Sequence, residues 1–252
     1  MTLTEALSYS LPSMLLLLGE SNMYQRFFSA RDPQTAKRSV IGWLSGTIIL
    51  ETLIAILAVI ASSIFLNIES EKVILFSVKN GVPLAVGALL LAAIVATIVS
   101  TADSFLLVPS INVMRDFYQK FFSPNPTPKK MILYSRIVVV LLGIVAFLQV
   151  RFFKGVLEMA LYAYTMYGVG ITPAVLACFF WKRVTPAGGV VSIASGMGTT
   201  LIWELLNQPN DIPTVYPALL MSLSGLVIVS LLTRPSAPEK WQPFFENKRN
   251  SE

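Results

Sequence analysis

The chain has 252 residues, of which 54% are hydrophobic and 13% are charged, and its mean hydropathy is +0.67. Soluble domains carry about a quarter charged residues, so this composition argues against a soluble globule and against a disordered chain. The absence of histidine excludes a Ser-His-Asp triad and any histidine metal ligand. The single cysteine excludes an internal disulfide.

Seven apolar stretches are long enough, at about 20 residues each, to be candidates for membrane helices. They carry no apolar/polar alternation of the kind that a membrane strand needs. The expected fold class is therefore an all-α, polytopic membrane protein with about seven transmembrane helices. We expect one membrane domain over residues 1–233 and a short cytoplasmic tail over 234–252. The seven stretches are residues 3–19, 40–66, 82–108, 132–150, 156–181, 188–206 and 215–232.

The basic residues divide unequally between the two sides of a seven-helix arrangement. If the loop after the first stretch is cytoplasmic, 15 of the 19 lysines and arginines lie inside and four lie outside. The positive-inside rule then predicts a cell-membrane protein with its N-terminus outside and its C-terminus in the cytoplasm. The net charge of +5 is explained by basic loops that face an anionic leaflet, so no nucleic-acid partner is needed.

Ionisable residues inside a membrane span are candidates for function, and three stand out here: Glu20, Glu51 and Asp103. Glu51 lies near the middle of the second stretch. Its carboxyl group has two interpretations, a hydrogen bond to a neighbouring helix or a functional role.

The third stretch has the clearest polar pattern. Thr97, Ser100, Thr101 and Ser104 follow the spacing i, i+3, i+4 and i+7, so they share one helical face, and Asp103 lies about a third of a turn away. Their oxygens are suited to a hard cation. Two interpretations stay open: the hydroxyls bond to carbonyls of their own helix, or something polar faces the stripe.

The first stretch is interrupted by Gly19 and Glu20 before a helical pattern resumes. This pattern fits either a helix that leaves the membrane or a broken helix at a transporter binding site. A similar weak zone lies at 167–173, and tyrosines precede it. We take the following residues as candidates, the first three for a gate or coupling group and the last three for a solute cavity: Asp103, Ser104, Glu20, Gly19, Tyr164 and Tyr167.

Three groups of residues together resemble the sodium:solute symporter family, which includes proline, pantothenate, monocarboxylate and sugar symporters. The resemblance runs from about residue 11 to residue 206. The groups are residues 24–31 (YQRFFSAR), residues 100–104 (STADS) with 106–107 and 115–118 (RDFY), and residues 172–174 (TPA) with 180–188 (FWKRVTPAG).

The resemblance implies a LeuT-like fold of two inverted five-helix repeats that works by alternating access. It also implies one sodium ion, held by the hydroxyls of Ser100 and Thr101 and the carbonyl of Thr97. The remaining sodium ligands in the family are carbonyls of a broken helix in the first repeat. This chain resembles only the second repeat and two trailing helices, so the expected partners are the lipid bilayer, a small solute and a missing N-terminal half. Pro109, close to the hydroxyl motif, departs from the pattern.

The leading functional hypothesis is sodium-coupled symport of a small solute, with no organic cofactor. The alternative is a non-transporting remnant or an interaction subunit in the membrane. An enzyme is not expected, because the sequence has no Gly-framed serine and no paired metal-ligand motif. The solute itself is not readable from these residues.

Overall fold

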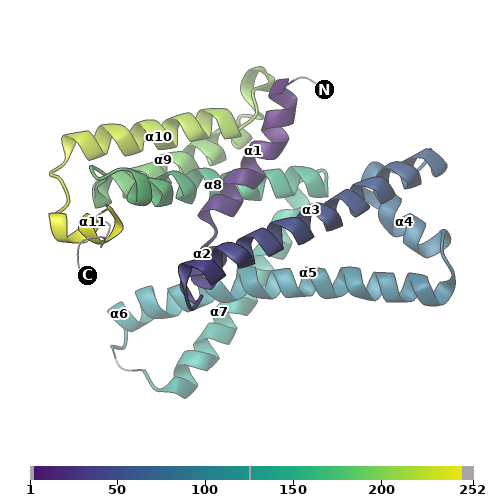
Figure 1. Cartoon of the computed structure of the whole chain (residues 1–252), viewed down its shortest axis with the longest axis horizontal. Helices are drawn as coiled ribbons and strands as arrows, with labels where there is room; N and C mark the ends of the chain where they lie inside the picture. Colours follow the sequence, from purple (N-terminus) through teal and green to yellow (C-terminus); the bar gives the residue numbers. More distant parts are fainter. Residues whose placement is uncertain (1–2, 125, 246–252) are drawn as a thin grey trace. The chain divides into compact units, whose positions relative to one another are not determined.

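All secondary structure in the computed structural model, which describes residues 3–124 and 126–245, is helical (Figure 1). Each of the seven apolar stretches forms a helix, and this confirms the predicted all-α class. Two of these helices, α1 (Leu3–Gly19) and α10 (Val215–Leu232), have the predicted bounds. The other five begin or end within seven residues of the prediction: α3 (Pro33–Ile64), α5 (Leu84–Asn112), α7 (Pro128–Gln149), α8 (Val156–Phe180) and α9 (Pro186–Leu205).

Shorter elements connect these helices. The chain continues from α5 through a π-helical segment that begins four residues after Pro109, whose ring removes one backbone donor from the helix. The shorter elements are α2 (Ser21–Phe28), η1 (Ser70–Lys72), α4 (Val73–Asn80), η2 (Val113–Tyr118), α6 (Gln119–Phe121), η3 (Val150–Phe152), η4 (Pro209–Asp211) and α11 (Pro238–Phe245).

Five segments in the described part of the chain are long and apolar enough to cross a membrane: Pro33–Ile64, Leu84–Phe121, Pro128–Phe152, Val156–Phe180 and Val215–Leu232. The helix α1 is apolar but has only 17 residues. The helix α9 has 20 residues, but its glycines, serines and threonines lower its hydropathy. Together these helices describe a multi-pass membrane protein.

The helix α3 begins seven residues before its apolar stretch because its first turn is capped. The Asp32 carboxylate accepts hydrogen bonds from the Thr35 backbone N–H at 2.7 Å and from the Thr35 hydroxyl at 2.8 Å. Pro33 at the first helical position lacks the N–H that would otherwise need a partner. Hydropathy therefore marks the membrane part of α3, whereas the cap sets its beginning.

The helices divide into two compact units, which we call the terminal unit (residues 1–41 and 157–252) and the central unit (residues 42–156). The helix α3 begins in the first and continues into the second. The predicted single domain over 1–233 stays a prediction. Within the predicted tail, α11 is described, and residues 246–252 lie outside the described residues.

The terminal unit has a core of small and β-branched side chains. Val169, Val215 and Ala218 are buried and pack against side chains of α1 and α10. In this core the Ser222 hydroxyl donates to the Val169 carbonyl at 2.9 Å and shares a 2.9 Å hydrogen bond with Ser192. Figure 1 shows α9 and α10 lying side by side, and these polar contacts help to join them to α8.

The central unit buries less of its long helices. Only 6% of the most apolar window of Leu84–Phe121 is buried, and none of the window of Pro128–Phe152. Contacts within the unit are concentrated near helix ends, where Phe65 meets Phe76 and Tyr118 meets Tyr134 at ring-centroid distances of 5.0 and 5.1 Å. The long apolar faces of these helices thus remain exposed to lipid or to another protein surface.

Candidate functional site

The hydroxyl stripe of α5 is exposed along its whole length. The hydroxyls of Thr97, Thr101 and Ser104 donate to the carbonyls of Ala93, Thr97 and Ser100 at 2.9, 2.9 and 3.2 Å. The intrahelical bonding considered from sequence is therefore present at these three positions. The Ser100 hydroxyl differs, since it has no hydrogen-bond partner among the described residues.

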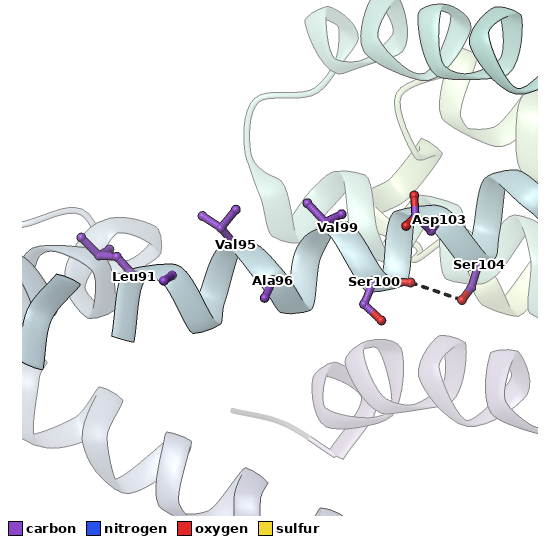
Figure 2. Close-up of a pocket in the computed structure, with 8 residues that line it drawn as sticks. Leu91, Val95, Ala96, Val99, Ser100, Asp103 and Ser104 are labelled. Carbon is purple, nitrogen blue, oxygen red and sulfur yellow. Dashed lines mark hydrogen bonds between the residues drawn. The ribbon is translucent and has the colours of Figure 1, made fainter. Parts of the chain in front are cut away.

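A hollow of about 890 Å³ runs along α5 beside this stripe. Figure 2 shows its lining as two rows, one that carries Val95, Val99 and Asp103 and another with Ser100 and Ser104. Thr97 and Thr101 do not line the hollow. The structure thus brings Ser100, Ser104 and Asp103 to one surface and places the two threonines beside it.

Two predicted sodium ligands lie next to each other on this helix. The Thr101 hydroxyl oxygen and the Thr97 carbonyl oxygen are 2.9 Å apart, and the unpartnered Ser100 hydroxyl belongs to the adjacent residue. Oxygens at this separation can both contact one small hard cation. A single helix offers too few oxygens to replace the whole hydration shell of such a cation, so a complete site here would need ligands from other segments.

The helix α1 ends at Gly19 and α2 begins at Ser21, with Glu20 in an extended conformation between them (φ −71°, ψ 118°). The side chain of Glu20 is half-buried and accepts a hydrogen bond from the Asn22 amide at 3.2 Å. The structure thus shows a break in the helix at Glu20, followed by a second helix. Whether the break lies inside the membrane stays a prediction.

The end of α1 is fastened to α8. The Thr172 hydroxyl donates to the Leu15 carbonyl at 2.5 Å, and the Tyr167 hydroxyl donates to the Gly19 carbonyl at 3.4 Å. A Cβ atom on Gly19 would lie only 2.2 Å from the Thr172 hydroxyl oxygen, so the close approach of the helices requires glycine there. Gly19 and Tyr167 therefore meet, whereas Tyr164 is half-buried and makes no hydrogen bond among the described residues.

Two further groups were not predicted as site residues. Thr172 was part of a motif only, although its spacing of four from Gly168 places both on the face of α8 that meets α1. Glu158 and Thr165 line a cavity with Glu204, and their spacing of seven on α8 was the available signal. Glu51 is exposed on α3, and no hydrogen bond to a neighbouring helix is present among the described residues.

Comparison with known proteins gives one family. The family model described as the sodium:solute symporter family matches residues 2–196. The osmoregulated proline transporter OpuE of Bacillus subtilis is 26% identical over 235 residues, which cover 90% of this chain and 48% of that protein. The high-affinity proline transporter PutP of Bacillus subtilis is 28% identical over 228 residues, which cover 86% and 47%.

The sodium/proline symporter of Haemophilus influenzae is 28% identical over 231 residues, which cover 85% of this chain and 45% of that protein. The chain thus spans about half the length of the curated relatives that it matches. No solved structure matches it.

Proposed function

The chain belongs to the sodium:solute symporter family, and from this premise we propose that it supplies the second half of a sodium-coupled transporter for a small solute. It is a membrane component and not an enzyme. The relatives that it matches are likewise described as transporters. The alignment of almost the whole chain with about half of each relative supports this proposal. Because those relatives are described as proline transporters, proline is the first solute to test.

In the proposed mechanism, α5 supplies three oxygens to the coupling ion: the hydroxyls of Ser100 and Thr101 and the carbonyl of Thr97. The observation that carries this assignment is the 2.9 Å separation of the Thr101 hydroxyl and the Thr97 carbonyl, beside a Ser100 hydroxyl without a partner. When sodium binds, the Thr101 hydroxyl turns its lone pairs to the ion and gives up its bond to Thr97. Carbonyls of the other half complete the shell.

Other polar residues take supporting roles in this proposal. Asp103 and Ser104 line the hollow beside the sodium ligands and would respond to the ion as a gate or coupling group. Glu20 would act as a gate or coupling group at the break between α1 and α2. The solute would bind near that break, where the carbonyl of Gly19 lies beside Tyr167, with Tyr164 on the same helix. Half-helix ends and freed carbonyls are common solute-binding groups in transporters.

The sodium assignment is tested by uptake of proline after co-expression with the matching first half of the Bacillus subtilis proline transporter. Thr101→Ala should raise the half-saturating sodium concentration about tenfold, because a contact to a charge is worth roughly 1.5–3 kcal/mol. Thr101→Ser keeps the oxygen and should change the curve little. Thr97→Ala is the matched control, since only its backbone is used. Unchanged sodium curves for Thr101→Ala and Ser100→Ala would show that the stripe is packing polarity.

The alternative is a non-transporting membrane subunit, which the match to only half of each relative also favours. Vesicles with this chain alone should not accumulate proline in a sodium gradient under either proposal. Uptake restored by the first half would support the transporter. Stable association of the two halves without uptake would support the subunit.

The proposed orientation has the N-terminus outside and the C-terminus in the cytoplasm. Its basis is the unequal distribution of lysine and arginine. Reporter fusions after Lys130 and at the end of the chain should both give cytoplasmic signals, and an external signal from either would contradict this topology.

A further inference from the structure

A groove of about 620 Å³ lies between α5 and α7, wholly within the central unit. It begins beyond Ser104, where the hollow beside the hydroxyl stripe ends, and the two share no lining residue. Its walls are apolar on both helices, and a single charged side chain, Arg136, lies among them. The apolar side chains of the walls include Leu107, Ile111, Ile132, Val139 and Val140.

The groove has the length of one half of a bilayer. Its wall on α7 extends from Met131 to Val140, which is about 14 Å of helix. The hydrocarbon core of a membrane is roughly 30 Å thick, so the groove matches the acyl chains of a single leaflet. Tyr118 and Tyr134 join the segment after α5 to the start of α7, with 5.1 Å between their ring centroids, and so hold the walls together near the polar end.

Arg136 is a cation without a counter-charge in the part of the chain that the structure describes. It makes no hydrogen bond or ion pair there, and no aspartate or glutamate lines the groove. It lies about 6 Å inside the apolar stretch that begins at Ile132. A charge at this depth is costly unless an anion or water reaches it, and an arginine near a helix end extends toward the headgroups. An anionic group at headgroup level therefore complements it.

The segment next to the groove has the composition of a membrane interface on an anionic leaflet. Residues 115–136 contain five basic residues and one acidic residue. Phenylalanines are exposed between them, and the Lys120 ammonium lies 5.8 Å from the centroid of the Phe121 ring. Lys129 lies seven residues before Arg136, so it shares the same helical face about 10 Å nearer the start of α7. Basic pockets between membrane helices bind anionic lipid headgroups.

We propose that this groove binds one anionic phospholipid, with the phosphate on Arg136 and an acyl chain along the apolar walls. A guanidinium group can hold a phosphate bidentately, and Lys129 faces the same headgroup from the start of the helix. The basic residues extend beyond the groove, and a leaflet supplies phosphates to all of them, whereas a partner helix would have to place a carboxylate at one position. Under the proposed orientation this is the cytoplasmic leaflet, which carries anionic lipids.

Native mass spectrometry of the full chain, released from detergent micelles, tests this proposal. Phosphatidylglycerol and phosphatidylcholine with the same acyl chains are titrated in parallel, and the first phosphatidylglycerol should bind about tenfold more tightly. Arg136→Gln should remove most of this preference, because a contact between opposite charges is worth about a factor of ten. Arg136→Lys keeps the charge and should retain most of it. Arg151→Gln, at the other end of the same membrane segment, is the matched control and should leave the preference unchanged.

A second pair of variants separates the groove from general attraction between charges. Val139→Trp fills the groove and keeps Arg136, so it should weaken binding of the first phosphatidylglycerol about tenfold. Val145→Trp places the same side chain at an exposed position of α7 outside the groove, and it should have no effect. An excess of inorganic phosphate should not displace the lipid, because the acyl chain contributes to binding. Circular dichroism of each variant must show the unmodified helix content.

The proposal is overturned if Arg136→Gln and Arg151→Gln reduce the lipid preference equally, if Val139→Trp has no effect, or if phosphate alone displaces the lipid. It is also overturned if the first half of a transporter binds the chain, Val139→Trp abolishes that association, and phosphatidylglycerol shows no preference, because the groove would then be a protein interface. The lipid titrations require no uptake, so this test and the test of the proposed function fail independently.

Discussion

The two units use their small residues differently. In the terminal unit, a Cβ atom on Gly168 would lie 2.7 Å from the Leu15 Cβ, and one on Gly196 would lie 2.9 Å from the Val169 carbonyl oxygen. In the central unit, a Cβ atom on Gly46 or Gly143 would meet nothing within 4 Å. Membrane helices approach closely through small residues, and in the terminal unit long helices do so at Gly168 and Gly196. In the central unit Gly87 of α5 approaches the short helix α4, where a Cβ atom would lie 2.6 Å from the Val78 carbonyl oxygen, but the glycines in the middle of α3 and α7 face open space.

The exposed long helices of the central unit agree with the finding that the chain spans only about half the length of its relatives. The exposed spans of the central unit carry the hydroxyl stripe and its hollow, whereas the buried hydroxyls of the terminal unit already bond across helices. Under the proposed function, these exposed spans of the central unit are the surface on which the other half would pack. The following predictions test that contrast, beginning with the largest expected effect.

Gly168→Ala should destabilise the chain strongly, whereas Gly143→Ala should not. The added methyl group on Gly168 would press against Leu15 and against the Leu16 backbone nitrogen at 2.9 Å, and such overpacking costs about 1–3 kcal/mol. In α7, replacing glycine by alanine should stabilise the helix by roughly 0.5–1 kcal/mol. Unfolding of the purified chain in mixed detergent micelles, followed by circular dichroism, measures both.

The opposite ranking would contradict the contrast between the units. When the first half of a transporter is present, the same Gly143→Ala change reports on the new interface. A loss of association there, without a loss of stability in the isolated chain, would show that the bare face of α7 is covered on assembly.

Thr172→Val should have a smaller effect, about 1 kcal/mol, because it removes one hydrogen bond between α8 and α1. Thr101→Val removes only an intrahelical bond on an exposed face, so the stability of the isolated chain should barely change. The same micelle titration compares them, with Thr172→Ser as the control that keeps the hydroxyl. Equal losses for the two valine variants would show that cross-helix bonds contribute nothing extra here.

Hydropathy predicted the helices well because a membrane span must be both apolar and internally hydrogen-bonded. The ends were less predictable, and α3 is the clearest example. Its polar first turn lies outside any apolar stretch, and the cap formed by Asp32 extends the helix to Pro33. Sequence also gave no division into two units, since that depends on which small residues face one another.

The candidate site was predictable only where it follows from helical periodicity. The shared face of the α5 hydroxyls and the separate row of Asp103 are properties of a single helix, and Figure 2 shows both rows. The bonds of Thr172 to Leu15 and of Tyr167 to Gly19 join positions about 150 residues apart, so local spacing could not reveal them.

The smallest expected effect concerns how two helices of the terminal unit begin. The first turn of α9 is capped by Thr185, which is buried and is also bonded to Ser230 and Thr233. The first turn of α3 is capped by Asp32, whose partners are all local. Tertiary contacts support the start of α9, whereas only local bonds support the start of α3. Protonation of Asp32 should therefore weaken the first turn of α3 without affecting the rest of the fold.

The hydrogen bonds from the Thr35 backbone and hydroxyl lower the pKa of Asp32 below its usual value. A carboxylate with a lowered pKa in the folded state stabilises the first turn at all pH values above the unfolded pKa, and this contribution is lost as pH falls through the lowered value. The Thr35 amide resonance should therefore titrate with a midpoint below that of an unstructured aspartate. Asp32→Asn should abolish this titration and keep the turn, whereas Asp32→Ala should speed amide exchange there. A midpoint at or above the ordinary value would mean that Asp32 does not cap α3 in solution.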